Sequence, residues 1–252
     1  KKKKIKGLSA QRADILPAAL AVIKAFVMYM HVENFTISGA GLREGIMFNQ
    51  ALPSTIEKPV SDVLNYSLTT LVKWYDCDEK HVEHVVNLSI QLFKQLRVLH
   101  KFPRQYLKVL KVAATLHDCG MRIKYYNHQR HSWYMILNAN LYGVTHREIV
   151  LAAFTACCHK KEDINPLDWA RFKDILRDED IEIVKRLGVM LRIAESLDRS
   201  MSGCIKGINC DILGDSVIMK TEVEGDATLE IRDAMAAGAE FKKSFHKNLE
   251  IL

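Results

Sequence analysis

Between residues 61 and 202, apolar residues recur at the three- and four-residue spacing of an amphipathic helix in one segment after another. Each such helix has one apolar face to bury, so several of them must pack around a shared core. Helices are expected over residues 62–75, 79–99, 103–117, 132–138, 145–159 and 179–198. The chain is therefore predicted to be mainly α, with a helical domain over residues 53–202.

The segment before this domain has a different pattern. Residues 8–31 have the spacing of an amphipathic helix, residues 35–38 read as a short strand, and residues 51–60 contain two prolines and read as a linker. One helix and one strand have neither a sheet nor a core of their own. Residues 1–52 are therefore expected to be the last part of a domain whose beginning is missing.

After Gly203 the helical periodicity gives way to alternation. Strands are expected over residues 207–213, 217–223 and 228–231, separated by the turn signals Gly214-Asp215 and Gly225-Asp226. A helix over residues 234–246 and a last strand over 249–252 complete the prediction. Residues 203–252 are thus expected to form a small α+β domain.

Composition limits the classes of function. A chain of 252 residues with net charge +6 favours polyanionic partners modestly. The sequence has neither an apolar run of about eighteen residues nor the apolar stretch of a secretory signal, which argues against a membrane protein. Its six cysteines show neither a CxxC pair nor zinc-ligand spacing, a pattern that suits the reducing cytoplasm.

Histidine and acidic residues gather at the ends of the expected helices. His81 begins one helix, and His117-Asp118 closes the apolar run LKVAATLHDCG. Glu195 and Asp198 are three residues apart, so both carboxylates project from one helical face. Imidazoles with one or two carboxylates suit a divalent cation, which can polarise a phosphoryl oxygen or activate water. Mg²⁺ or Mn²⁺ is expected first, with Fe or Zn as alternatives.

The order His, His-Asp and a late acidic residue resembles the HD superfamily of phosphohydrolases. The segments LKVAATLHDCGMRIKYYNHQRHSWYMILN, LYGVTHREIVLAA and LGVMLRIAESLDRS also resemble the C-terminal region of the exopolyphosphatase and guanosine pentaphosphate phosphohydrolase family. The opening GLSAQRADILPAALAV and the segment SGAGLREGI are similar to the end of that family's actin-like fold. The resemblance implies an actin-like remnant over residues 1–52 and an HD-type helical domain.

This resemblance implies a parent enzyme that hydrolyses phosphoanhydride bonds of inorganic polyphosphate or guanosine pentaphosphate. Its principal phosphatase site is expected in the missing actin-like lobes, so the catalytic residues lie outside this chain. A homodimer is implied, and nucleic acid is not an expected partner. Basic residues are candidates for guiding the polyanion along the helical domain: Arg122, Lys124, Arg130, Lys160 and Lys161.

The resemblance also marks His81, His117 and Asp118 as metal ligands, with His131 and His159 as candidates for a second metal or for phosphate. Glu195 stands where HD proteins have Asp, so Glu195 substitutes, Asp198 replaces it, or the site is empty.

Simpler interpretations of these residues stay open. His84 competes with His81 one turn away, His128 is expected in a loop, and His117-Asp118 can be a helix C-terminal pair. For His131 and His159, a solvated or core-bonded role is the commoner one. Two alternative functions follow: a freestanding HD metal-dependent nucleotide phosphohydrolase, and a non-catalytic module for dimerisation and for binding polyphosphate or an alarmone.

Overall fold

The computed structural model describes residues 5, 8–35, 37–39, 41–52, 60–160 and 164–252. The chain divides into two compact units, residues 1–59 (the N-terminal unit) and residues 60–252 (the main unit). The boundary that the sequence predicts after residue 52 stays a prediction, because this division falls after residue 59. The boundary predicted after residue 202 lies within the main unit and stays a prediction.

The N-terminal unit is helical where it is described. It contains α1 (Ala10–Ala13), α2 (Leu16–Tyr29) and α3 (Leu42–Ala51). None of the residues of α2 or α3 is buried, although α2 is rich in apolar side chains. The strand predicted over residues 35–38 is not found at Phe35, Ile37 or Ser38, and Thr36 lies outside the described residues. The described part of this unit offers no neighbouring strand with which such a segment can pair.

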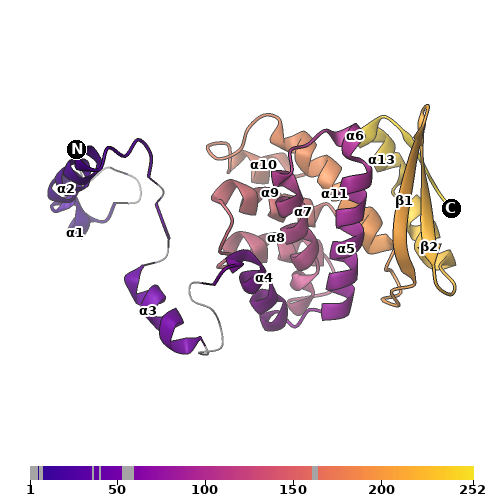
Figure 1. Ribbon diagram of the computed structural model, residues 1–252, viewed down its shortest axis with the longest axis horizontal. Helices are drawn as coiled ribbons and strands as arrows, with labels where there is room; N and C mark the ends of the chain where they lie inside the picture. The colour runs from indigo at the N-terminus through magenta and orange to yellow at the C-terminus, as the bar shows by residue number, and fades with distance from the viewer. Residues whose placement is uncertain (1–4, 6–7, 36, 40, 53–59, 161–163) are drawn as a thin grey trace. The chain divides into compact units, whose positions relative to one another are not determined.

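Helices make up most of the main unit, and each of the six segments predicted as helical between residues 61 and 202 contains one. The α-helices described between residues 60 and 202 are α4 (Val63–Trp74), α5 (Glu79–Gln95), α6 (Arg97–His100), α7 (Gln105–Leu116), α8 (His128–Asn138), α9 (His146–Cys157), α10 (Pro166–Ala170) and α11 (Asp180–Ser196). The 3-10 helix η2 (Cys119–Arg122) follows α7. Aspartate side chains cap two of these helices: Asp62 caps α4 and Asp78 caps α5. The main unit is mainly α, as predicted (Figure 1).

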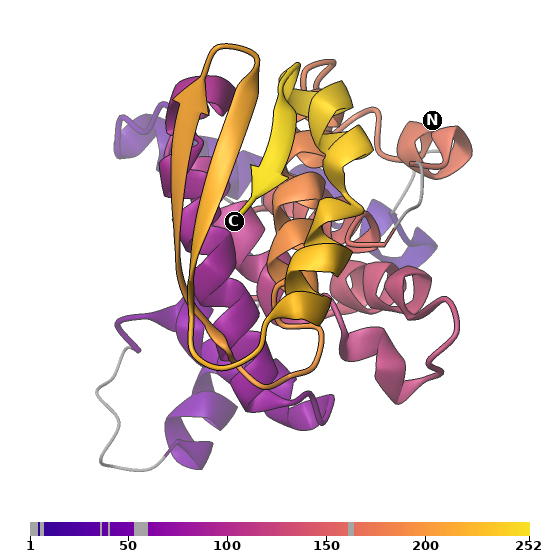
Figure 2. The ribbon, with the colours of Figure 1, turned by 90° about the vertical axis from the view of Figure 1, so that its right-hand side faces the viewer.

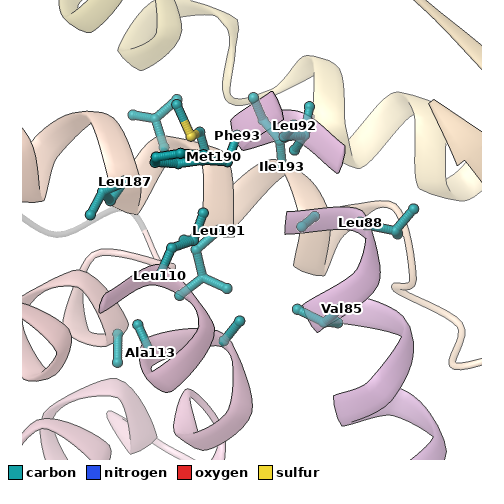
Figure 3. Close-up of a cluster of buried hydrophobic side chains, with 14 of the residues drawn as sticks. Val85, Leu88, Leu92, Phe93, Leu110, Ala113, Leu187, Met190, Leu191 and Ile193 are labelled. Atoms are coloured by element: carbon teal, nitrogen blue, oxygen red, sulfur yellow. The ribbon is translucent and has the colours of Figure 1, made fainter. Parts of the chain in front are cut away.

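Helices α5, α7 and α11 supply the centre of the core. Figure 3 shows Leu88 of α5, Leu110 of α7 and Leu191 of α11 within one apolar cluster. All three side chains are at most 1% exposed, so each gains close to the full burial energy of a leucine, about 1.5–3 kcal/mol. This packing fixes the ends of α5, α7 and α11 relative to one another, and these ends carry the residues of the candidate site.

A three-stranded sheet packs against this helical core. The strands β1 (Ile205–Leu213), β2 (Ser216–Val223) and β3 (Asn248–Ile251) confirm three of the predicted strands. Their order is β1-β2-β3, with β1 antiparallel and β3 parallel to β2. Strand β1 packs on α5, and β3 lies beside α12 (Thr228–Met235) and α13 (Gly238–Phe245) (Figure 2).

The strand predicted over residues 228–231 is wrong, because this segment begins α12. The Asp226 carboxylate accepts hydrogen bonds from both the backbone N–H and the hydroxyl of Thr228, at 2.9 and 2.6 Å. This aspartate turn lies directly before α12, whose N-cap residue is Ala227. The buried residues Ala227, Glu230 and Ala234 then follow helical spacing. Among the described residues, none of the helices has both the length and the apolarity needed to cross a membrane.

Gly120 allows η2 to approach α8 closely. A Cβ atom at Gly120 would lie 2.2 Å from the carbonyl oxygen of His128 and 2.4 Å from the backbone nitrogen of Ser132. Gly120→Ala therefore has to move backbone atoms, and we expect it to reduce the free energy of unfolding by about 1–3 kcal/mol. Gly238→Ala is the control, because a Cβ there meets nothing within 4 Å. Chemical denaturation measures both, and equal stability of the two variants would contradict the close approach.

His100 makes the stability depend on pH. Its buried ring donates from Nε2 to the Phe93 carbonyl and accepts at Nδ1 from the Phe102 N–H, both at 2.8 Å, so it is neutral. Burial lowers the pKa of His100. The unfolded chain thus takes up a proton near its ordinary pKa of about 6.5, and this contribution to stability is lost as the pH falls below that value.

We therefore expect wild type to lose more unfolding free energy than His100→Gln between about pH 7.5 and about pH 5. Denaturant titrations at several pH values measure this difference, and parallel curves for the two proteins would contradict it.

Candidate functional site

Asp118 lies at the junction where α7 ends and η2 begins. His117 is the C-terminal cap of α7, and Asp118 is the residue before η2. The apolar residues before them are buried along α7, so His117 and Asp118 lie in the interior of the main unit. His117 is fully buried, and the Asp118 side chain is only 11% exposed.

Four imidazoles surround the Asp118 carboxylate. Their Nε2 atoms lie 3.2 Å (His128), 3.5 Å (His159), 3.6 Å (His117) and 3.9 Å (His81) from its oxygens. The five side chains form two overlapping groups, His81-His117-Asp118 and Asp118-His128-His159, each with ligand atoms within 4.8 Å of one another. We call these five residues the His/Asp cluster. Asp118 belongs to both groups.

The second nitrogen of each imidazole is held by an acceptor. Nδ1 of His117, His128 and His159 donates to the carbonyl three residues earlier in the chain, of Ala114, Tyr125 and Ala156. Nδ1 of His81 lies 2.7 Å from the Asp198 carboxylate. A carbonyl or carboxylate oxygen only accepts, so Nδ1 carries the proton. In the neutral ring, Nε2 then presents its lone pair toward Asp118, which is the arrangement of metal-binding histidines.

Two observations show that neutral rings leave this arrangement incompletely satisfied. Among the described residues, the buried Nε2 atoms of His81 and His117 lack a hydrogen-bond partner. The Nε2 atoms of His128 and His159 face each other at 3.0 Å, although both rings already carry a proton at Nδ1. Two opposed lone pairs need either a second proton on one ring or a shared cation. The donor set therefore fits a divalent metal ion.

The electrostatics of the cluster keep Asp118 charged. Burial raises its pKa, but the nearby His117, His128 and His159 outweigh this effect and lower the pKa far below its ordinary value. Burial lowers the pKa of His128, whereas the Asp118 carboxylate 3.2 Å from its Nε2 has the opposite effect and the pKa is raised overall. The fully buried His159 has its pKa lowered by burial and by His117. The cluster thus combines a carboxylate with at least one neutral imidazole.

Asp198 lies behind His81 and outside both groups. One of its oxygens accepts from His81 Nδ1, and the other lies 2.9 Å from His84 Nδ1 and accepts from the Gly203 N–H. Burial raises the Asp198 pKa, but the bonds from His81 and His84 lower it overall. His84, which competed with His81 for the ligand role, instead contacts the Ile205 carbonyl and Asp198. Asp198 is therefore placed to orient His81.

Glu195, also a candidate ligand, lies outside both groups as well. Its buried carboxylate accepts hydrogen bonds from Lys160 at 2.8 Å and Arg199 at 3.0 Å. The glutamate carboxylate therefore neutralises two cations beside the cluster. Sequence reasoning did not foresee Arg199, although its position four residues after Glu195 is the spacing of a helical ion pair.

The second group contains His128 in place of the predicted His131. The prediction of a loop at His128 is wrong, because His128 is the first residue of α8, which begins four residues earlier than expected. Its ring is buried against His159, whereas His131 is half-buried and belongs to neither group. The sequence shows that His128 lies ten residues after Asp118. Which histidine faces Asp118, however, depends on where α8 begins.

Three of the described basic residues proposed to guide a polyanion take part in ion pairs. Arg122 pairs with Asp76 at 3.1 Å, Arg130 with Asp168 at 3.1 Å, and Lys160 with Glu195. Lys124 is exposed, and Lys161 lies outside the described residues. Ion pairs with carboxylates thus partly neutralise the positive charge of these residues, which the sequence suggested was available to a polyanion.

Comparison with known proteins gives the same family over most of the chain. Residues 63–233 match the family described as "Ppx/GppA phosphatase, domain III". Residues 1–54 match the one described as "Ppx/GppA phosphatase family".

Curated relatives cover a shorter stretch. A guanosine-5'-triphosphate,3'-diphosphate pyrophosphatase of Aeromonas salmonicida is 30% identical over 142 residues, which are 56% of this chain and 28% of the relative. Proteins with the same name from Aliivibrio fischeri and Vibrio vulnificus are 30% and 26% identical, each covering 56% of this chain and 28% of the relative. The aligned region is thus less than a third of each relative.

The domain III match alone covers more than half of the residues, including all five members of the His/Asp cluster. The chain therefore belongs to the Ppx/GppA phosphatase family.

Proposed function

We propose that this chain is the C-terminal, metal-binding part of a phosphoanhydride hydrolase of the Ppx/GppA family, with an HD-type helical domain. The observation that carries this proposal is the orientation of four imidazoles around one nearly buried carboxylate, each with Nδ1 bonded to an acceptor and Nε2 directed at Asp118. A solvated or structural histidine cluster has no need for this uniform orientation.

In the proposed centre, His81, His117 and Asp118 hold one divalent ion and Asp118, His128 and His159 hold a second. Mg²⁺ or Mn²⁺ is the preferred occupant, with Fe or Zn as alternatives. A bound ion of this kind supplies a Lewis acid for a phosphoryl oxygen and lowers the pKa of a coordinated water. Asp198 orients His81, and Lys160 and Arg199 supply positive charge beside the cluster.

The parent protein is proposed to hydrolyse phosphoanhydride bonds of inorganic polyphosphate or guanosine pentaphosphate. The family match and the name of the relatives support this. Residues 1–52 are proposed to belong to an actin-like lobe, because residues 1–54 match the family and α2 leaves its apolar side chains exposed. The principal phosphatase residues are then contributed by parts of the parent outside this chain. A homodimer and a cytoplasmic location stay predictions.

A purely non-catalytic polyanion-binding module receives less support. Arg122, Arg130 and Lys160 each already pair with a carboxylate. In addition, a binding module has no use for buried imidazole nitrogens without partners. The cluster favours a metal centre.

Asp118→Asn removes the charge that both groups share while keeping the size of the side chain. We expect the variant to lose bound Mn²⁺, measured as metal per chain by elemental analysis after loading and dialysis, because a neutral amide is a poor ligand for divalent ions. Asp211→Asn is the matched control, since Asp211 is an exposed carboxylate paired with Lys220 on β1 and β2. Equal metal content in Asp118→Asn and wild type, or none in wild type, would refute the proposed centre.

Asp198→Asn tests whether Asp198 orients His81. Loss of a group that orients a metal-binding histidine lowers metal affinity by about 10- to 100-fold, and we expect a reduction of this size in the Mn²⁺ affinity measured by calorimetric titration. Asp215→Asn, in the exposed turn between β1 and β2, is the control. An unchanged affinity would exclude the orienting role, and complete loss of one ion would indicate that Asp198 ligates the metal directly.

A further inference from the structure

His84 lies one turn after His81 on α5, on the same side of the helix. His81 is a member of the His/Asp cluster, whereas His84 belongs to neither group of possible ligands. Both rings nevertheless meet one carboxylate. Nδ1 of His81 lies 2.7 Å from one oxygen of Asp198, and Nδ1 of His84 lies 2.9 Å from the other. The Asp198 carboxylate is therefore held between two imidazoles of the same helix.

Both ring nitrogens of His84 face acceptors. Nε2 lies 2.6 Å from the carbonyl oxygen of Ile205, and Nδ1, which is buried from solvent, lies 2.9 Å from Asp198. Neither a carbonyl nor an ionised carboxylate can donate a proton. A neutral imidazole carries only one proton, so one of its lone pairs would point at an oxygen. The geometry is satisfied when both nitrogens carry a proton, which makes the ring a cation.

The surroundings of His84 support this charge. The Asp198 carboxylate raises the pKa of His84, burial opposes this effect, and the Ile205 carbonyl raises the pKa further. Lys206 acts in the opposite direction, but the pKa is raised overall.

The charge of His84 matters because Asp198 is itself buried, with only 2% of its surface exposed. A buried carboxylate is costly unless an opposite charge and hydrogen bonds match it. The His84 ring supplies the charge, and the Gly203 N–H donates at 2.9 Å to the same oxygen. The other oxygen is left to accept from Nδ1 of His81. His84 thus keeps Asp198 ionised and directed at His81.

His84 also fastens the segment that carries this carboxylate. Ile205 is the first residue of β1, and Asp198 and Gly203 lie between the end of α11 and β1. One imidazole on α5 therefore contacts this connecting segment at both of its ends. The segment that carries Asp198 is in this way held against the helix that carries His81.

We propose that His84 is a positioning residue of the metal centre: it holds the Asp198 carboxylate ionised and in place, and Asp198 in turn orients the ligand His81. This inference rests on the proposed function, since it concerns the ion that His81 would bind. His84 acts through Asp198 and is not a ligand, because protein oxygens face both of its ring nitrogens.

The test measures the Mn²⁺ affinity of the chain by calorimetric titration. His84→Gln keeps a polar side chain but removes the positive charge that matches Asp198. We expect it to weaken Mn²⁺ binding by about tenfold, the lower end of the effect of losing a group that orients a metal-binding histidine. His146→Gln is the matched control, because His146 is exposed and belongs to neither group of possible ligands.

Two further variants separate positioning from a general structural role. His84→Arg restores both the charge and donors for two oxygens, and the cavity of about 570 Å³ that His84 and Asp198 line leaves room for the longer side chain. It is expected to bind Mn²⁺ within about threefold of wild type. In an Asp198→Asn background the carboxylate charge is absent, so His84→Gln is expected to cost no more than about a further twofold.

Nuclear magnetic resonance of the metal-free wild type reports on the ring directly. Long-range ¹H–¹⁵N correlation spectra at pH 7 are expected to show a proton on both ring nitrogens of His84, with the signals assigned by their loss in His84→Gln or His84→Arg. A ring with a single proton would overturn the inference, as would His84→Gln that binds Mn²⁺ like wild type or that loses the same factor in the Asp198→Asn background.

The affinity of wild type distinguishes this inference from the proposed function. A wild-type chain that binds Mn²⁺ no more tightly than His84→Gln disproves only the role of His84. A wild-type chain that does not bind Mn²⁺ disproves the proposed centre and, with it, the role of His84.

Discussion

The structure of this site depends on keeping one carboxylate charged in the interior of a helical unit. An isolated buried carboxylate costs several kcal/mol or more unless groups of opposite polarity surround it. Asp118 meets this requirement through imidazoles contributed by α5, α7, α8 and the end of α9, since it lies within 3.2–3.9 Å of His81, His117, His128 and His159. The ends of four helices must therefore meet at one point, and the leucine-rich core of α5, α7 and α11 holds them there.

A single local device sets the orientation of three of the four imidazoles. His117, His128 and His159 each bond through Nδ1 to the carbonyl three residues earlier, and two of them do so at the end of a helix. The last carbonyls of a helix have no partner within it. A histidine placed there satisfies one of them and at the same time fixes its own tautomer. A histidine at the end of a helix therefore bonds to one of its last carbonyls through Nδ1, which leaves Nε2 available to a metal.

The sequence predicted the parts of this arrangement that depend on periodicity. Helical spacing located the helices that end near His117 and His159, and the resemblance to HD proteins selected His81 and Asp118. It did not distinguish His128 from His131, because that choice depends on where α8 begins. Nor did alternation over residues 228–231 reveal that α12 begins there, since a short polar-apolar alternation suits either state.

Glu195 shows why a departure from a motif has to be judged by its contacts. HD proteins have Asp at this position, and the extra methylene of glutamate displaces the carboxylate. The sequence alone therefore left open whether the metal site is occupied. In the structure the two groups of possible ligands form without it, and the glutamate carboxylate instead joins Lys160 to Arg199. The buried carboxylate offsets the repulsion between two cations that would otherwise face the cluster together. A glutamate at this position is therefore compatible with both groups of possible ligands, and it holds two cations beside the cluster.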